Sequence, residues 1–291
     1  MSMDKDWLAA LLRDEQLPEG FAAEVDRLHV PLAARIAAVA MGPAFVVGIC
    51  GPQGSGKSTA VLVLRRLLEQ QGFKVAILSL DDLYLPIEDR EALARDVHPL
   101  LRTRGVPGTH DVAFGLRVLD GLAGEGATAI PRFDKATDSR APAETWPVVQ
   151  GPVDVVLFEG WCVGARPEPA EALKTPINAL EREYDPDGAW RTHVNAALGG
   201  PYRALFARPD LLIQFVAPDF ETVIAWRQAQ ERKLRERLAA TGAGSARAMD
   251  EAQVAVFVQH YERLTRHVAR EMPARAELVM RLDGERRSTN P

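Results

Sequence analysis

One eight-residue segment constrains this chain more than any other feature. Residues 51–58, GPQGSGKS, match the pattern G-x-x-x-x-G-K-[ST] and directly follow the apolar run AFVVGIC at 44–50. The pattern predicts a glycine-rich loop between a buried strand and a helix, whose backbone N–H groups and helix N-terminus hold the phosphates of a nucleotide. Glycine suits this loop because a Cβ atom would block the phosphates and oppose turns with positive φ.

The residues of this loop are therefore candidate ligands of ATP. Lys57 is expected to reach the β- and γ-phosphates, and Ser58 is expected to coordinate Mg²⁺. The predicted nucleotide site comprises Gly51, Pro52, Gln53, Gly54, Ser55, Gly56, Lys57, Ser58 and Thr59. An ordinary glycine-rich turn is the alternative, and the strand before the loop and the helix after it argue against that alternative.

Composition limits the class of protein. Of 291 residues, 47% are hydrophobic and 26% are charged, which suits one large domain, or one domain with a small appendage. The net charge of −5 gives no electrostatic reason to expect a nucleic-acid partner. No apolar run approaches the roughly 20 residues of a membrane span, so we expect no membrane partner. The two cysteines lack a C-x-x-C arrangement and the N-terminus lacks a signal-peptide pattern, so we expect a cytoplasmic protein.

Apolar runs alternate with helical patterns along the chain. Strands are predicted at 44–50, 74–80, 153–158, 211–216 and 277–282, with a short one at 129–133, and helices at 57–71, 111–124, 220–240 and 250–271. This alternation predicts an α/β fold of the P-loop NTPase type, a doubly wound parallel sheet flanked by helices. We expect residues 1–43 to form an N-terminal helical extension that packs on a P-loop domain of residues 44–291.

Acidic residues follow two predicted strands, at the edge where parallel sheets bind ligands. Asp81 and Asp82 follow strand 74–80, and Glu159 follows strand 153–158. A carboxylate after the second strand can accept the proton of a substrate hydroxyl that attacks the γ-phosphate, and we assign this role to Asp81. Asp82 is expected either to orient Mg²⁺ or to be solvated. Glu159 is expected to hold Mg²⁺ together with Ser58, directly or through water.

Basic residues form a third group. They are Arg102 and Arg104 in one segment, Arg132, Lys135 and Arg140 in a second, and Arg166 after the third strand. An arginine fork pairs bidentately with a carboxylate, so this group favours a small acidic substrate, held by Arg102, Arg104 or Arg166. Arg132 is a further candidate contact with the substrate. For any single arginine, a surface role is the alternative.

Three more residues are candidates for the site. Tyr84 lies three positions after Asp81, and His110 is expected either to contact the substrate or to cap its own loop. Arg227 begins a cationic stretch in helix 220–240, where cations on a mobile helix can close over the γ-phosphate, stabilise the transition state and exclude water. A solvated charged face with i,i+4 pairs such as Glu231–Arg235 is the alternative.

Four segments resemble one known family. They are SLDDLYL at 79–85, LRTRGVPGTHD at 101–111, PRFDK at 131–135 and FEGWCVG at 158–164. They resemble D-glycerate 3-kinases of the plant and fungal type and their bacterial relatives, a family similar to phosphoribulokinases, uridine kinases and pantothenate kinases. The resemblance covers residues 45–285. It implies phosphorylation of the 3-hydroxyl of D-glycerate by ATP with Mg²⁺, giving 3-phosphoglycerate and ADP (EC 2.7.1.31).

The resemblance also implies roles for individual residues. Lys57 and Ser58 match the nucleotide and metal residues, Asp81 the proposed base, and Glu159 the acid after the metal-site strand. Arg227 begins the segment that matches a helical lid, at about 220–248.

The chain departs from the plant enzymes after Asp134 and Lys135. There the plant enzymes carry a longer stretch rich in glycine and arginine, which is abbreviated here to ATDSR at 136–140. We also expect no chloroplast transit segment. Because the stretch borders the expected acceptor site, the acceptor could also be a nucleoside, pantothenate or a sugar phosphate.

A nucleotide-binding switch or regulatory ATPase is the alternative from another functional class. Against it, the chain has no N-K-x-D tetrad, and D-x-x-G occurs at 185–188 only as a turn.

Overall fold

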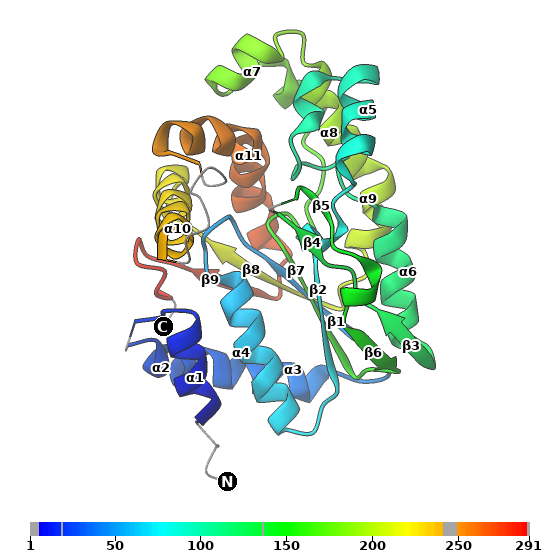
Figure 1. Ribbon diagram of the computed structural model, residues 1–291, viewed down its shortest axis with the longest axis vertical. Helices are drawn as coiled ribbons and strands as arrows, with labels where there is room; N and C mark the ends of the chain where they lie inside the picture. The colour runs from blue at the N-terminus through cyan, green and yellow to red at the C-terminus, as the bar shows by residue number, and fades with distance from the viewer. Residues whose placement is uncertain (1–5, 19, 136, 241–248, 290–291) are drawn as a thin grey trace.

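A five-stranded parallel sheet forms the centre of the protein (Figure 1). The computed structural model describes residues 6–18, 20–135, 137–240 and 249–289. The strands of the sheet are β1 (Phe45–Cys50), β2 (Val75–Ser79), β7 (Val155–Gly160), β8 (Leu211–Val216) and β9 (Leu278–Arg281). They lie in the order β2-β7-β1-β8-β9, and each neighbouring pair is parallel. The predicted doubly wound parallel sheet is confirmed.

The central strands supply apolar side chains to two layers of core. Every residue of β7 and of β8 is buried. Val47 and Ile49 of β1 pack in the layer of α4 (Lys57–Gln70), whereas Val46 and Cys50 pack in the opposite layer. Because successive side chains of a strand point to opposite faces, one continuous apolar run serves both layers, as parallel sheets require.

One face of the sheet is covered by α4 and by helices from the N-terminal part of the chain. These are α1 (Asp6–Asp14), α2 (Phe21–Glu24), the π-helical turn η1 (Val25–His29) and α3 (Val30–Val39). Leu8 and Ile36 share one apolar core with Leu64 of α4 and Val155 of the sheet. The described part of the N-terminal segment thus packs on the nucleotide-binding core. The division of the chain into two domains stays a prediction.

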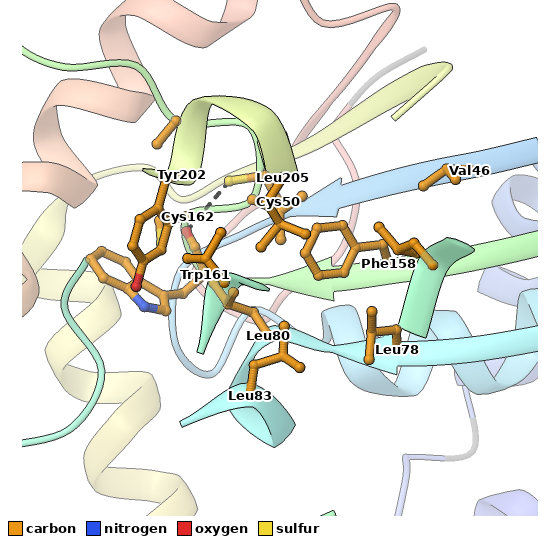
Figure 2. Packing of buried hydrophobic residues seen from close by; sticks show 14 of the residues in the cluster. Val46, Cys50, Leu78, Leu80, Leu83, Phe158, Trp161, Cys162, Tyr202 and Leu205 are labelled. Carbon is orange, nitrogen blue, oxygen red and sulfur yellow. Dashed lines mark hydrogen bonds between the residues drawn. The ribbon is translucent and has the colours of Figure 1, made fainter. Parts of the chain in front are cut away.

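The opposite face is covered by α6 (Val112–Ala123), α9 (Pro201–Phe206) and α11 (Glu251–Glu271). Figure 2 shows part of this core, where Phe158, Trp161, Cys162 and Tyr202 lie around the ends of β1 and β7. The α6 helix begins where a cap was predicted, since Asp111 accepts a 2.9 Å hydrogen bond from the backbone N–H of Phe114.

Helices α10 (Phe220–Ala240) and α11 pack side by side beyond β8. Asp219 caps α10 by accepting a 2.7 Å bond from the N–H of Thr222, and Asp250 forms a capping box with Gln253 at the start of α11. Both helix starts agree with the predictions. Of the predicted lid, α10 is described, whereas the loop 241–248 lies outside the described residues.

Two small antiparallel sheets were not predicted. β3 (Gly126–Ala129) pairs with β6 (Val148–Gly151), and β4 (Phe133–Asp134) pairs with β5 (Ser139–Arg140). The predicted short strand at 129–133 is wrong at its centre, because residues 130–132 lie between β3 and β4 and belong to neither strand. Two-residue strands carry no readable periodicity, so the β4–β5 hairpin left no signal in the sequence.

Shorter helices complete the fold. They are α5 (Ile87–Asp96), α7 (Ala179–Tyr184), α8 (Ala189–Gly199) and the 3₁₀ turns η2 (Leu80–Leu83), η3 (Pro99–Arg102), η4 (Ala143–Thr145), η5 (Ala170–Lys174) and η7 (Met272–Ala274). Across the described ranges, no helix combines the length and the apolar character that a bilayer crossing needs.

Candidate active site

The loop after β1 has the backbone that its sequence pattern predicts. Helix α4 begins at Lys57, and Gly54 and Gly56 adopt φ angles of +75° and +84°. A Cβ atom on Gly54 would lie 2.7 Å from Cβ of Trp226, so both backbone strain and steric clash require glycine there. No acidic residue lies in the first turn of α4. The partial positive charge of this helix end is therefore available to an anion.

Glu159 lies beside the loop, within β7 rather than after it. The predicted end of this strand at Phe158 is wrong, because Glu159 and Gly160 pair with Ile49 and Cys50 of β1. Glu159 Oε1 accepts a 2.8 Å hydrogen bond from Ser79 Oγ and a 3.3 Å bond from Ser58 Oγ. Lys57 Nζ lies 3.9 Å from the other oxygen, Oε2. The predicted metal residues, Ser58 and Glu159, thus lie together beside Lys57.

The second oxygen of Glu159 fits a cation. Oε2 is buried and accepts no hydrogen bond from any described residue. Leaving a buried carboxylate oxygen unpaired costs free energy. Mg²⁺ binds hard oxygen ligands, typically one or two carboxylates together with phosphate oxygens and water. The carboxylate of Glu159 and the hydroxyl of Ser58 are donors of this kind.

Asp81 lies in η2, at the end of the neighbouring strand β2. Tyr84 Oη donates a 2.7 Å hydrogen bond to its Oδ1, and Lys135 Nζ donates one of the same length to its Oδ2. Burial acts to raise the pKa of Asp81. The charges of Lys135 and Lys57, with these two hydrogen bonds, outweigh burial and hold the pKa well below its ordinary value. Asp81 is therefore an anion, and its Oδ2 is hydrogen-bonded to Lys135.

Asp82 faces a different partner, the start of the β4–β5 hairpin. Its Oδ1 accepts a 2.9 Å bond from the N–H of Phe133, and its Oδ2 accepts a 3.1 Å bond from Arg132 Nη1. The expectation of a solvated Asp82 is wrong, because both oxygens hold the hairpin. Arg132, predicted to contact substrate, is engaged at the hairpin base and also donates to the carbonyl of Pro131.

Arg104 lies near Tyr84 through the ring of Phe133. Its guanidinium lies over the ring of Phe133, 5.6 Å from the centroid. The rings of Phe133 and Tyr84 pack in a T-shaped arrangement, with their centroids 5.1 Å apart. One N–H group of Arg104 binds Asp138 of the hairpin. Asp138 also pairs at 2.7 Å with Arg90, which is 1% exposed. Arg90 was missed, since nothing in its local sequence distinguishes it from a surface arginine of α5.

Arg102 and Arg166 are placed differently from the predictions. Arg102 Nη2 pairs at 2.8 Å with Glu91, and 66% of its side chain is exposed. Arg166 is exposed after β7, and its carbonyl oxygen lies 3.1 Å from His267 Nε2. This arrangement favours the surface alternative for both arginines.

His110 is a buried neighbour of Asp81 and Tyr84. Its ring lies 4.8 Å from that of Tyr84, and burial lowers its pKa to about 3, so the ring is neutral. Tyr202 Oη accepts the N–H groups of Gly108 and His110 and lies 2.6 Å from His110 Nδ1. Tyr202 therefore donates its own proton to Nδ1, and Nε2 carries the proton of the ring. This Nε2–H has no partner among the described residues. Tyr202 was missed because it lies 92 positions away in the sequence.

Arg227 lies on α10 against α11. It pairs with Glu231 one turn later, donates a 3.0 Å bond to Gln230, and lies 5.7 Å from the ring centroid of Phe257. The i,i+4 pair in the structure is thus Arg227–Glu231 rather than Glu231–Arg235. A role of Arg227 toward the γ-phosphate stays a prediction.

The nucleotide-binding segment of this chain matches a known family model. Residues 19–83 match the family model described as Methylmalonyl Co-A mutase-associated GTPase MeaB. That stretch is less than a quarter of the chain and contains the phosphate loop and β2. The match reflects the nucleotide-binding segment rather than the whole protein.

Two kinases match the chain over longer stretches. A Schizosaccharomyces pombe protein named Uncharacterized kinase mug58 is 32% identical over 229 residues, covering 76% of this chain and 79% of that protein. The chloroplastic D-glycerate 3-kinase of Arabidopsis thaliana is 38% identical over 172 residues, covering 53% of this chain but only 37% of the plant protein.

A solved structure has the same architecture. The D-glycerate 3-kinase from Cryptococcus neoformans var. grubii superposes with a TM-score of 0.70 at 26% identity, covering 94% of this chain and 99% of that one. The phosphate loop, the parallel sheet and these relatives together define the chain as a phosphotransferase with the P-loop kinase fold, and it belongs to the D-glycerate 3-kinase family.

Proposed function

We propose that this kinase transfers the γ-phosphoryl group of ATP to the 3-hydroxyl of D-glycerate, giving 3-phosphoglycerate and ADP. The observation that carries the proposal is the position of Asp81 between two sets of charges. On one side, Lys57 and Glu159 lie 3.9 Å apart at the proposed nucleotide site. On the other, Lys135 and Arg104 form a cationic acceptor side. A nucleotide switch has no use for that second set.

The nucleotide side would position and neutralise the phosphates. Backbone N–H groups of residues 51–58 and Lys57 would bind the β- and γ-phosphate oxygens. Ser58 and Glu159 would hold Mg²⁺, which when bound supplies positive charge to the phosphate oxygens. Positioning and charge neutralisation account for most of the rate enhancement in phosphoryl transfer, because the transition state is loose.

The acceptor side would orient the attacking hydroxyl. Asp81 accepts the hydrogen bond of that hydroxyl and takes its proton as the new O–P bond forms and the bond from phosphorus to the ADP oxygen breaks. Tyr84 fixes the orientation of Asp81 through its 2.7 Å hydrogen bond. Burial raises the pKa of Tyr84 far above its ordinary value, so the phenol stays a donor. The Nε2–H of His110 is a donor for another acceptor oxygen.

The charges of this side support an acidic acceptor. A carboxylate can pair with the free N–H groups of Arg104 and with Lys135, and charge-assisted hydrogen bonds of this kind are roughly twice as strong as neutral ones. A neutral nucleoside carries no charge that either cation could pair with. The name of the fungal relative, D-glycerate 3-kinase, supports glycerate among the small acids.

An acceptor panel tests this proposal. ADP release is followed with Mg-ATP and, in separate reactions, D-glycerate, uridine, pantothenate, ribulose 5-phosphate and no acceptor. We expect strong stimulation by D-glycerate alone. Stimulation by another acceptor would keep the kinase mechanism and refute the glycerate assignment, and turnover that ignores every acceptor would favour a regulatory ATPase.

A further inference from the structure

A lysine of the same chain, Lys135, binds the candidate base Asp81. Lys135 Nζ donates a 2.7 Å hydrogen bond to Asp81 Oδ2, and Tyr84 holds the other oxygen. In this arrangement Asp81 has its charge neutralised, and the oxygen that should face a hydroxyl carries an ammonium group. Something must remove Lys135 before Asp81 can accept a proton from the acceptor.

The β4–β5 hairpin is built so that Lys135 can leave without unfolding it. Three separate contacts fix the hairpin. These are Phe133 N–H to Asp82 at 2.9 Å, Arg140 to Asp111 at 3.0 Å, and Asp138 to the buried Arg90 at 2.7 Å. None of them uses Lys135, whose side chain is 60% exposed. Rotation of its four-carbon stem is therefore enough to move the ammonium group.

We propose that Lys135 is a gate on Asp81 that the acceptor opens: the carboxylate of the acidic acceptor draws the Lys135 ammonium away, and Asp81 then accepts the acceptor's hydroxyl. This inference rests on the proposed function, because it requires an acceptor that carries both a carboxylate and a hydroxyl. It assigns Lys135 as a positioning residue that couples acceptor binding to the activation of Asp81.

The exchange conserves the number of ion pairs. Before binding, Lys135 pairs with Asp81; afterwards it pairs with the acceptor carboxylate, next to Arg104, while Asp81 hydrogen-bonds the acceptor hydroxyl. An exposed ion pair contributes little to stability, so its replacement by an equivalent pair costs little. Water alone brings no carboxylate, so in its presence Lys135 stays on Asp81.

The gate gives this kinase protection against wasteful hydrolysis of ATP. In hydrolysis a water oxygen would form the bond to the γ-phosphorus, the bond to the ADP oxygen would break, and the water proton would pass to Asp81. That step needs the same free carboxylate as the transfer to the acceptor. With Lys135 in place, water finds Asp81 occupied, and the enzyme discriminates between water and acceptor through the acceptor's charge.

The wild-type enzyme allows a direct test with D-lactate, which has the carboxylate and 2-hydroxyl of D-glycerate but lacks the 3-hydroxyl. D-lactate should open the gate without being phosphorylated. We expect saturating D-lactate to raise inorganic phosphate release from Mg-ATP at least fivefold, whereas glycerol, which lacks the carboxylate, should leave it unchanged. Equal rates with D-lactate and with no addition would overturn the gate.

Substitutions at Lys135 give an independent readout. Lys135→Met should raise acceptor-independent phosphate release at least fivefold and should also raise KM for D-glycerate at least fivefold. Lys135→Arg, which keeps the charge, should restore slow hydrolysis. Lys174→Met is the matched control, because Lys174 forms an exposed ion pair with Glu171 on η5. Absence of either change in Lys135→Met overturns the gate.

The same assays separate this inference from the proposed function. If D-glycerate is phosphorylated but neither D-lactate nor Lys135→Met changes hydrolysis, the gate is wrong and the proposed function stands. If D-glycerate is not phosphorylated at all, the proposed function fails, and the gate fails with it.

Discussion

Ser79 and Glu159 are register partners on the neighbouring strands β2 and β7, and the hydroxyl of Ser79 donates a 2.8 Å hydrogen bond to Glu159 Oε1. The bond fixes the carboxylate so that its other oxygen, Oε2, lies toward Lys57 without a hydrogen bond of its own. Groups that orient a metal-binding carboxylate in this way commonly change metal affinity when they are removed.

Ser79→Ala should therefore weaken the response to Mg²⁺. We expect the free Mg²⁺ concentration that gives half-maximal activity to rise about tenfold, the lower end of the range for such partners, because Glu159 loses the group that orients it. The measurement is initial rate against free Mg²⁺ at saturating ATP. Ser79→Thr retains the hydroxyl and should behave like the wild type, so an unchanged Mg²⁺ dependence in Ser79→Ala would contradict this role.

Arg104 and Arg102 lie two positions apart, but Arg104 packs over Phe133 whereas Arg102 is exposed. Arg104→Gln should raise KM for the acidic acceptor by about 10- to 100-fold, since hydrogen bonds to charged groups contribute about 1.5–3 kcal/mol. Arg102→Gln should change KM less than twofold, because Arg102 is exposed and paired with Glu91. Steady-state kinetics with varied acceptor at saturating ATP distinguishes them, and equal effects of the two substitutions would refute the assignment of Arg104.

Asp81→Asn tests the proposed base. The amide keeps the shape of the side chain but neither accepts a proton nor pairs with Lys135. We expect kcat to fall by about 10² or more, as for loss of a general base, while ATP binding stays close to that of the wild type. Nucleotide affinity from calorimetry is the control for the intact loop. Turnover that survives within about tenfold of the wild type would mean that Asp81 is not the base.

The phosphate loop predicts a contrast between two glycines. Gly54→Ala should greatly weaken ATP binding, because residue 54 has φ +75° and its Cβ would lie 2.7 Å from Trp226. Backbone strain of this kind costs about 1 kcal/mol or more. Gly284→Ala is the control, since an added Cβ there meets no atom within 4 Å. If Gly54→Ala binds ATP as tightly as Gly284→Ala, the loop does not hold the phosphates as described.

Buried histidines should make stability depend on pH, and His110 and His260 are two of them. Burial lowers the pKa of His110 to about 3 and, despite opposing backbone hydrogen bonds, that of His260 to about 4. In the unfolded chain a histidine takes up a proton near pH 6.5. Between these values the unfolded state binds more protons, so stability is present above pH 6.5 and falls as the pH is lowered.

From pH 7.5 to 5.5 we expect each of these histidines to reduce the free energy of unfolding by about 1.4 kcal/mol. Urea denaturation at the two pH values measures the loss. His260→Gln removes one titrating group and should reduce the loss by that amount. A pH dependence that is the same in His260→Gln and the wild type would show that His260 is not the source.

The main elements of the fold could be predicted because their signals are local. The glycine pattern defines the loop, apolar runs define the parallel strands, and Asp111 and Asp250 mark helix starts. The end of β7 was misplaced because the pairing of Glu159 and Gly160 is decided by β1, which is distant in sequence. Sequence gives no local sign of such pairing.

The candidate site was predictable only in part, for the same physical reason. Asp81 and Glu159 follow the rule for ligand sites at strand ends. Whether Arg102 or Arg104 turns inward depends on how the segment after η3 packs against Phe133, which no local pattern encodes. The links from Tyr202 to His110 and from Arg90 to Asp138 join residues 92 and 48 positions apart, and only the folded chain brings them together.

The product formed from D-glycerate tests the proposed function most directly. The enzyme is incubated with Mg-ATP and D-glycerate, and the products are identified by ³¹P and ¹H NMR. We predict 3-phosphoglycerate and ADP in equal amounts, because we propose that Asp81 and the cationic acceptor side position the 3-hydroxyl for attack. A phosphate on the 2-hydroxyl, or inorganic phosphate in place of an organic ester, would contradict the proposed transfer to the 3-hydroxyl.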